Sequence, residues 1–220
     1  MEKNDNTQDL TEGGFRFFGK MSASATHEIK NTLAIINENI GLMDDLSMMA
    51  HDGMLSCEQI NRISKNIKNQ VKRSNYILQK LNKFSHSVDL SNQMIDLEKT
   101  IRFTLDLASR LIDMYEVAID ITPAPFSMGI KANRFFLENM IWKAVETACK
   151  GASQEKRVAI SFKQDKETMT VWFDMGNVED GFMENLFTAD EDRALIEYLS
   201  IAVEKNIEKH SFGLIWSEKI

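Results

Sequence analysis

The feature that most constrains the fold is a helical pattern of apolar residues that crosses the first 88 residues without a proline. Over residues 15–46, apolar or small side chains recur at intervals of three or four, the spacing of one face of an α-helix. The pattern breaks at 50–53 and resumes over residues 60–85. Ser56 followed three residues later by Gln59 is the signature of a helix start. We therefore expect two long helices that form an antiparallel hairpin.

This hairpin carries one long apolar face that it cannot bury by itself. Two such hairpins make a four-helix bundle, and a homodimer is the simplest source of the second hairpin. The alternative is that the face packs against the second half of the same chain. Because the apolar face is so long, we favour a dimeric four-helix bundle.

After residue 88 the pattern changes to shorter segments of two kinds. Helical spacing predicts helices over 96–115, 132–151 and 190–209, and alternation predicts strands over 117–121, 157–164, 168–175 and 212–217. Helices that alternate with paired strands favour an α/β sandwich with helices packed on one face of the sheet.

The expected fold class is therefore α+β, with three parts along the chain. Residues 1–14 are polar, end in Gly13-Gly14 and are expected to form a flexible leader. The helical hairpin then occupies residues 15–88, and the sandwich occupies residues 89–220.

Composition narrows the classes of function. The net charge is −7 and we expect no basic stripe of the kind that binds phosphate, so we expect no nucleic-acid partner. Two cysteines, Cys57 and Cys149, provide neither a disulfide framework nor a metal-ligand cluster, which fits a reducing compartment. No window approaches the run of about 18 apolar residues that a membrane span needs, and no signal peptide is evident. We expect a cytoplasmic protein without a membrane partner.

One histidine has neighbouring side chains that could take part in a reaction at its ring. At 100° per residue His27 lies about 200° from both Ala25 and Ile29, so we expect it to point away from the apolar face. Glu28 follows it directly, and Asn31 lies one helical turn further on. A neutral imidazole can attack a phosphoryl group, and an amide beside it can position water for hydrolysis. His27 is therefore a candidate phosphoacceptor that the aspartate of a partner protein could reach.

At this point the chain resembles the two-component histidine kinases. Residues 27–31 are similar to the phosphoacceptor motif H-E-x-x-N of that family, and residues 73–87 resemble the second helix of its dimerisation and phosphotransfer domain. The resemblance implies that His27 carries phosphate, that Glu28 assists as an acid or base, and that Asn31 supports phosphatase action. It also implies a response-regulator receiver domain as partner, whose footprint would include second-helix residues such as Arg73 and Tyr76.

The second half resembles the ATP-binding domain of these kinases in its order of elements, but its nucleotide motifs are degenerate. The family has two asparagines on one helix, the later of which reaches the magnesium ion, and Lys143 and Thr147 stand in these positions here. Asp174 and Gly176 are vestiges of the D-x-G-x-G box, in which Val178 replaces the second glycine.

The glycine-rich turn of the family is also missing. Residues 192–199 contain no glycine, and Leu195, Glu197 and Tyr198 would put bulk and a negative charge near the phosphates. Phosphate cradles need glycine so that backbone N–H groups can approach closely. We therefore expect a pseudo-ATPase domain that has lost ATP and magnesium binding.

Three functions are compatible with these observations. The leading hypothesis is a histidine phosphotransfer protein that passes phosphate between His27 and receiver-domain aspartates, with possible phosphatase action on a response regulator. The first alternative is a divergent but active sensor histidine kinase. The second is a non-catalytic scaffold that binds a response regulator.

Overall fold

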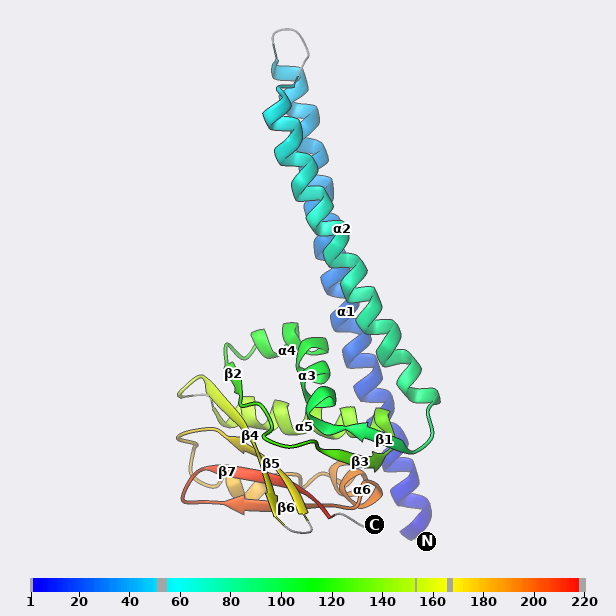
Figure 1. The fold of residues 1–220 in the computed structure, drawn as a ribbon, viewed down its shortest axis with the longest axis vertical. Helices are drawn as coiled ribbons and strands as arrows, with labels where there is room; N and C mark the ends of the chain where they lie inside the picture. The colour runs from blue at the N-terminus through cyan, green and yellow to red at the C-terminus, as the bar shows by residue number, and fades with distance from the viewer. Residues whose placement is uncertain (1, 51–54, 153, 166–167, 218–220) are drawn as a thin grey trace. The chain divides into compact units, whose positions relative to one another are not determined.

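The computed structural model describes residues 2–50, 55–152, 154–165 and 168–217 (Figure 1). The chain divides into two compact units, of which one is Met21–Phe84 and the other combines Met1–Lys20 with Ser85–Ile220. The expected hairpin loop falls mainly on residues 51–54, which lie outside the described residues. Within the described residues, no helix has the length and apolar character needed to span a bilayer.

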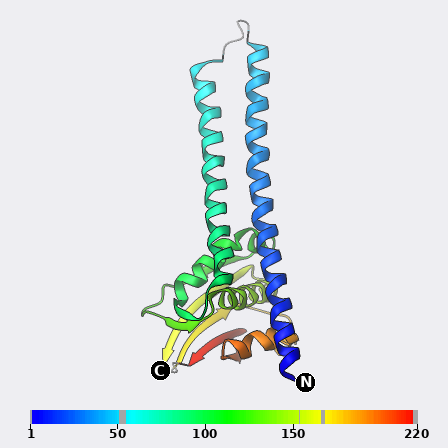
Figure 2. The same ribbon diagram turned by 90° about the vertical axis from the view of Figure 1, so that its right-hand side faces the viewer.

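Two long antiparallel helices confirm the expected hairpin (Figures 1 and 2). Helix α1 spans Glu2–Met49 and helix α2 spans Cys57–Ser85. The capping box at the start of α2 is present, because the Ser56 N–H donates to Gln59 Oε1 at 2.9 Å and the Gln59 N–H donates to Ser56 Oγ at 3.2 Å. These bonds satisfy donors that would otherwise be unpaired at the helix start.

The segment expected as a flexible leader is helical in the structure, because α1 begins at Glu2. Gly13 and Gly14 allow a close approach of this segment to the sandwich instead of ending a leader. A Cβ atom at Gly13 would lie 3.3 Å from Glu191 Cβ, and one at Gly14 would lie 3.2 Å from the Phe135 ring. The Phe17 and Phe135 rings meet with centroids 5.6 Å apart. The first 20 residues therefore belong to the compact unit that contains the sandwich.

The sandwich consists of helices packed against a mixed sheet. Its helices are α3 (Leu97–Leu107), α4 (Ser109–Asp113), α5 (Arg134–Gly151) and α6 (Asp190–Tyr198), with short 3₁₀ turns at His86–Asp89 and Met183–Asn185. Its strands are β1 (Gln93–Asp96), β2 (Ala118–Ile121), β3 (Gly129–Ala132), β4 (Arg157–Asp165), β5 (Thr168–Asp174), β6 (Ile201–Asn206) and β7 (Ser211–Ser217).

The main sheet has the strand order β2-β4-β5-β7-β6, in which only the β2–β4 pair is parallel. Strands β1 and β3 form a separate antiparallel pair. Helix α5 packs on β4 and β5, and α3 and α6 pack against α5. This arrangement gives the helix layer and sheet layer of an α/β sandwich, as the sequence predicts.

Three local expectations for the sandwich were wrong or incomplete. The helix expected over 96–115 breaks at Ala108 into α3 and α4. The helix expected over 190–209 ends at Tyr198, and β6 follows as an edge strand that pairs with β7. Ser200, with φ of 52°, turns the chain between the two. The short pair β1 and β3 was not predicted.

Candidate functional site

His27 lies on α1 with its side chain exposed, as the helical spacing predicts. Within the described part of the chain its imidazole has no hydrogen-bond or ion-pair partner, so both ring nitrogens face solvent. Asn31, one turn further along α1, is also exposed. Glu28 differs from both because its side chain is only 11% exposed and faces α2. The structure therefore brings the three predicted residues together on one stretch of helix.

Two contacts between the helices fix α2 beside this stretch. Arg73 Nη2 lies 3.6 Å from Glu28 Oε2, and their side chains are 60% and 11% exposed. Ser74, the next residue on α2, shares a hydrogen bond of 2.5 Å with Thr32 Oγ1. Thr32 is 1% exposed, so this part-buried bond is shielded from water on one side and anchors the register of the hairpin. Arg73 is thereby held near the phosphoacceptor motif.

Helix α2 carries a basic stripe, contrary to the expectation that the chain has none. Its seven basic side chains fall within an arc of about 140°, opposite the apolar face of the helix. They are Arg62, Lys65, Lys68, Lys72, Arg73, Lys80 and Lys83, against a single acidic residue, Glu58. Residues 21–84 contain eight basic and six acidic side chains, a net charge of +2 in a chain whose total is −7. The overall charge conceals a local cationic surface.

The arrangement around His27 suits phosphoryl chemistry. An exposed imidazole on a stiff helix is an accessible nucleophile, and a carboxylate next to it can take up the proton that the ring releases. An exposed amide one turn away can orient a water molecule. Arg73 adds a cation that binds phosphate oxygens well because its planar guanidinium offers two parallel N–H groups.

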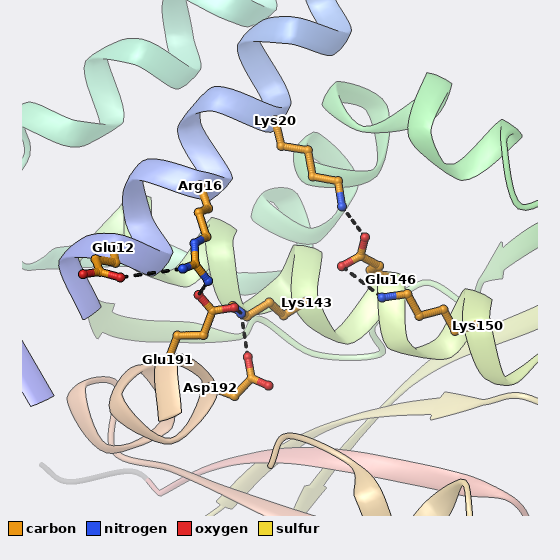
Figure 3. A network of polar contacts seen from close by, with 8 residues as sticks. All are labelled: Glu12, Arg16, Lys20, Lys143, Glu146, Lys150, Glu191 and Asp192. Atoms are coloured by element: carbon orange, nitrogen blue, oxygen red, sulfur yellow. Dashed lines mark hydrogen bonds and ion pairs between the residues drawn. The ribbon is translucent and has the colours of Figure 1, made fainter. Parts of the chain in front are cut away.

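In the sandwich, Lys143 on α5 forms ion pairs with α6 (Figure 3). Its Nζ lies 2.6 Å from Asp192 Oδ1 and 3.0 Å from Glu191 Oε1. Glu191 also accepts a hydrogen bond of 3.2 Å from Arg16 of α1. The lysine that stands in an expected asparagine position therefore ties two helices of the sandwich together, with its side chain 16% exposed.

At Lys143, ion pairing raises the pKa of the amine by more than burial lowers it. Burial by itself would lower the pKa of this amine, but the hydrogen bonds to Asp192 and Glu191 raise the pKa above its ordinary value. The lysine is therefore a fixed cation at neutral pH. The first turn of α6 carries Asp190 together with these two carboxylates, so acidic groups occupy a helix start that would favour phosphate if it were neutral.

A second ion-pair cluster joins α1 to α5 within the same unit (Figure 3). Lys20 Nζ contacts Glu146 Oε1 and lies 5.1 Å from the centre of the Trp142 ring. Burial tends to raise the pKa of Glu146, but the hydrogen bond from Lys20 and nearby charges lower it below its ordinary value. Tyr115 donates to the same carboxylate at 3.1 Å, and burial followed by the negative charge of Glu146 raises its pKa to about 12.

Asp174 is the last residue of β5, and Gly176 lies in the turn that follows. The Gly176 N–H donates to Asp174 Oδ1 at 3.0 Å, and Gly176 has φ of +65°, which favours glycine. Glu155 fills the space beside this turn, since a Cβ atom at Gly176 would lie 2.2 Å from Glu155 Oε2. The Asn177 N–H also donates to Glu155 at 3.1 Å. A carboxylate of the chain itself therefore packs against the glycine turn.

Helix α5 also carries an asparagine close to the two positions of the expected asparagine pair. Asn139 lies four residues before Lys143 on α5, the same spacing that separates Lys143 from Thr147. Asn139 is 2% exposed, and its Oδ1 has no hydrogen-bond partner among the described residues. Thr147 is half-buried on the same helix.

Sequence reasoning missed the acidic partners of Lys143 and the link from Glu28 to Arg73. A signal for the first was present, because three acidic residues in a row begin α6 and match a lysine in the preceding helix. Among the described residues, no group of three or more histidine, cysteine or acidic side chains could hold a metal ion.

Comparison with known proteins gave matches among solved structures. No protein-family model and no curated protein sequence matches the chain. The histidine kinase AdeS of Acinetobacter baumannii is 14% identical with a TM-score of 0.45, over 88% of this chain and 98% of that chain. A histidine kinase from Burkholderia phymatum STM815 is 15% identical with a TM-score of 0.42, over 88% and 97% of the two chains.

A third match is the histidine kinase ThkA in a crystal structure with the response regulator protein TrrA. It is 17% identical with a TM-score of 0.46, over 98% of this chain and 66% of that chain. Histidine kinases are thus among the proteins of known structure to which this chain is similar.

Proposed function

We propose that this chain is a histidine phosphotransfer protein of a two-component phosphorelay. His27 accepts a phosphoryl group from the aspartate of one receiver domain and passes it to another. Glu28 takes up or returns the proton of the imidazole ring, and Asn31 orients water when phosphate is hydrolysed. Two copies of the chain pair through their hairpins in the cytoplasm, so that each dimer carries two phosphoacceptor histidines.

The observation that carries this proposal is the exposed, unpaired His27 beside Glu28 and Asn31 on a rigid helix. A phosphoacceptor must be reached by a partner protein, and a buried imidazole would not serve. The position away from the apolar face keeps His27 accessible after dimerisation.

The state of the sandwich favours phosphotransfer over ATP-dependent kinase activity. Phosphoryl transfer from ATP needs a metal ion and donors that neutralise the phosphates. The corresponding region holds Lys143 bound to Asp192 and Glu191, and it places acidic side chains at the start of α6. Lys143 is already paired there, so its charge does not neutralise a triphosphate, which would also lie beside the carboxylates of Asp190, Glu191 and Asp192. We infer that the phosphate on His27 comes from another protein.

The exposed apolar residues of the hairpin favour a homodimer. In the single chain, large apolar side chains on both helices of this unit are between 41% and 51% exposed. They are Leu33, Ile40, Leu42, Ile60, Val71 and Leu78. Apart from Leu42, which lies about 180° from Leu33 around α1, these residues repeat along one side of each helix, as is typical of an interface that a second hairpin covers.

A direct experiment is to mix the purified protein with receiver domains that carry a radiolabelled aspartyl phosphate. We expect the label to move to the wild-type protein and not to the H27A variant. The N31A variant should accept the label but should remove phosphate from the receiver domain more slowly. If no label reaches His27 and none is lost from any receiver domain, the phosphotransfer and phosphatase functions are both wrong.

Two further measurements separate the alternatives. Incubation with radiolabelled ATP and magnesium tests the alternative of an active histidine kinase. That alternative requires ATP-dependent labelling of His27. A purely binding scaffold predicts that H27A keeps its effect on the bound response regulator. Loss of that effect in H27A would favour phosphotransfer.

A further inference from the structure

We propose that Arg73 binds the phosphoryl group on His27. To do so, its guanidinium gives up its contact with Glu28. This inference rests on the proposed phosphotransfer function and assigns a residue to it that lies on the other helix of the hairpin. Arg73 acts in both directions of transfer, because the phosphoryl group carries its negative charge on either side of the reaction.

The position of Arg73 comes first in the argument. Its guanidinium lies 3.6 Å from the carboxylate of Glu28, and Glu28 is bonded through the backbone to His27. The part-buried bond between Thr32 and Ser74 holds the adjacent part of α2 against α1. Two separate contacts therefore hold Arg73 beside the residue that directly follows His27.

The ion pair is also weak enough to exchange. Arg73 is 60% exposed, and its 3.6 Å separation from Glu28 is longer than a charge-assisted hydrogen bond. Exposed pairs of this kind contribute little to stability, so little is lost when Arg73 changes partner. A phosphoryl group offers several oxygens that a guanidinium can bind in a bidentate manner, which a single long contact to a carboxylate does not provide.

Other nearby cations are less suited to binding the phosphoryl group. Lys30 and Lys72 are exposed, and neither makes an ion pair within the described residues. An ammonium at the end of a flexible stem is a point charge without a preset orientation. Arg73 is the cation of the basic stripe that already contacts the residue next to His27.

The chemical step balances with these groups. A lone pair on one ring nitrogen of His27 attacks the phosphorus of an aspartyl phosphate, the bond from phosphorus to the aspartate oxygen breaks, and its electron pair stays on the aspartate carboxylate. The other ring nitrogen then releases its proton to Glu28. Arg73 exchanges Glu28 for the phosphoryl group as that group arrives, because the phosphoryl oxygens offer the guanidinium a bidentate partner and the carboxylate contact does not.

The test uses phosphoramidate, a small phosphodonor, on the purified full chain, so that no partner protein is required. Phosphohistidine is measured by intact mass over time at several donor concentrations, for wild type, H27A, R73A, R73K and K72A. We expect R73A to react about 10- to 100-fold more slowly, the factor that follows from loss of one charge-assisted hydrogen bond. R73K should recover part of the rate. K72A is the matched control on the same stripe and should react as wild type does.

Chemical rescue separates phosphoryl binding from a structural contribution. Millimolar guanidinium chloride should accelerate R73A, whereas the same concentration of sodium chloride should not. A wild-type rate in R73A, or a slow R73A that guanidinium does not accelerate, overturns the assignment of Arg73. If wild type takes up no phosphate from phosphoramidate or from any receiver domain, the proposed function itself fails, and the assignment of Arg73 fails with it.

Discussion

Replacing Lys143 with methionine tests the link between α5 and α6. Methionine keeps most of the volume of the side chain but removes both hydrogen bonds, of 2.6 Å to Asp192 and 3.0 Å to Glu191. The three side chains are between 15% and 25% exposed, so water compensates the lost contacts only in part. Arg16 still neutralises Glu191 in the variant, which leaves Asp192 as the carboxylate without a cation.

The expected loss of stability follows from these contacts. Removing one partner of a fully buried ion pair costs about 3–5 kcal/mol. A hydrogen bond to a charged group contributes about 1.5–3 kcal/mol. Because the site is partly exposed and Arg16 remains, we expect K143M to lower the free energy of unfolding by about 2–3 kcal/mol, less than for a fully buried ion pair and within the range for a hydrogen bond to a charged group.

Urea unfolding followed by tryptophan fluorescence measures this change, since all three tryptophans lie in the sandwich. K150M is the matched control, because Lys150 on the same helix pairs with Glu146 at 3.6 Å and is 55% exposed. We expect this control to change stability by less than about 0.5 kcal/mol. If K143M loses no more than K150M, the ion pair does not stabilise the sandwich and the reasoning is refuted.

Three further predictions concern other parts of the chain. Asp96 caps α3, and its hydrogen bonds from Lys99 lower its pKa, so D96A should cost about 1 kcal/mol near pH 7. That stabilisation is present above the ordinary pKa of 3.8 and lost as pH falls through the lower folded value, so urea titrations at pH 7 and pH 3 should differ. L33E should convert the dimer to a monomer in size-exclusion chromatography with light scattering, and an unchanged mass would contradict the bundle. Gly19 has open space around it, so G19A should raise the free energy of unfolding by about 0.5–1 kcal/mol. G14A should not, because a Cβ atom there would press on the Phe135 ring. Thermal unfolding measures both variants, and equal shifts would contradict the close packing of Gly14.

The hairpin was predictable because its signals are local. Apolar spacing reports the exposed and buried faces of a helix directly, and it placed His27 on the solvent side. The capping box of Ser56 and Gln59 also depends only on neighbouring residues. The exposure of Asn31 follows from the same helix geometry.

Features that depend on distant partners were not predictable. Residues 201–206 form a strand because β7 pairs with them, although their charged residues suit a helix. Gly13 and Gly14 suggest flexibility in the sequence, because their close approach to Glu191 and Phe135 depends on residues far along the chain. Lys143 was recognised as a departure from a motif, but its partners lie almost 50 residues further along the chain.

The basic stripe on α2 also affects how the molecule behaves before any contact is made. Residues 21–84 carry a net charge of +2 and the remainder of the chain carries −9. At low ionic strength the stripe attracts an approaching anionic molecule to the face of α2 that carries it, and added salt weakens this attraction.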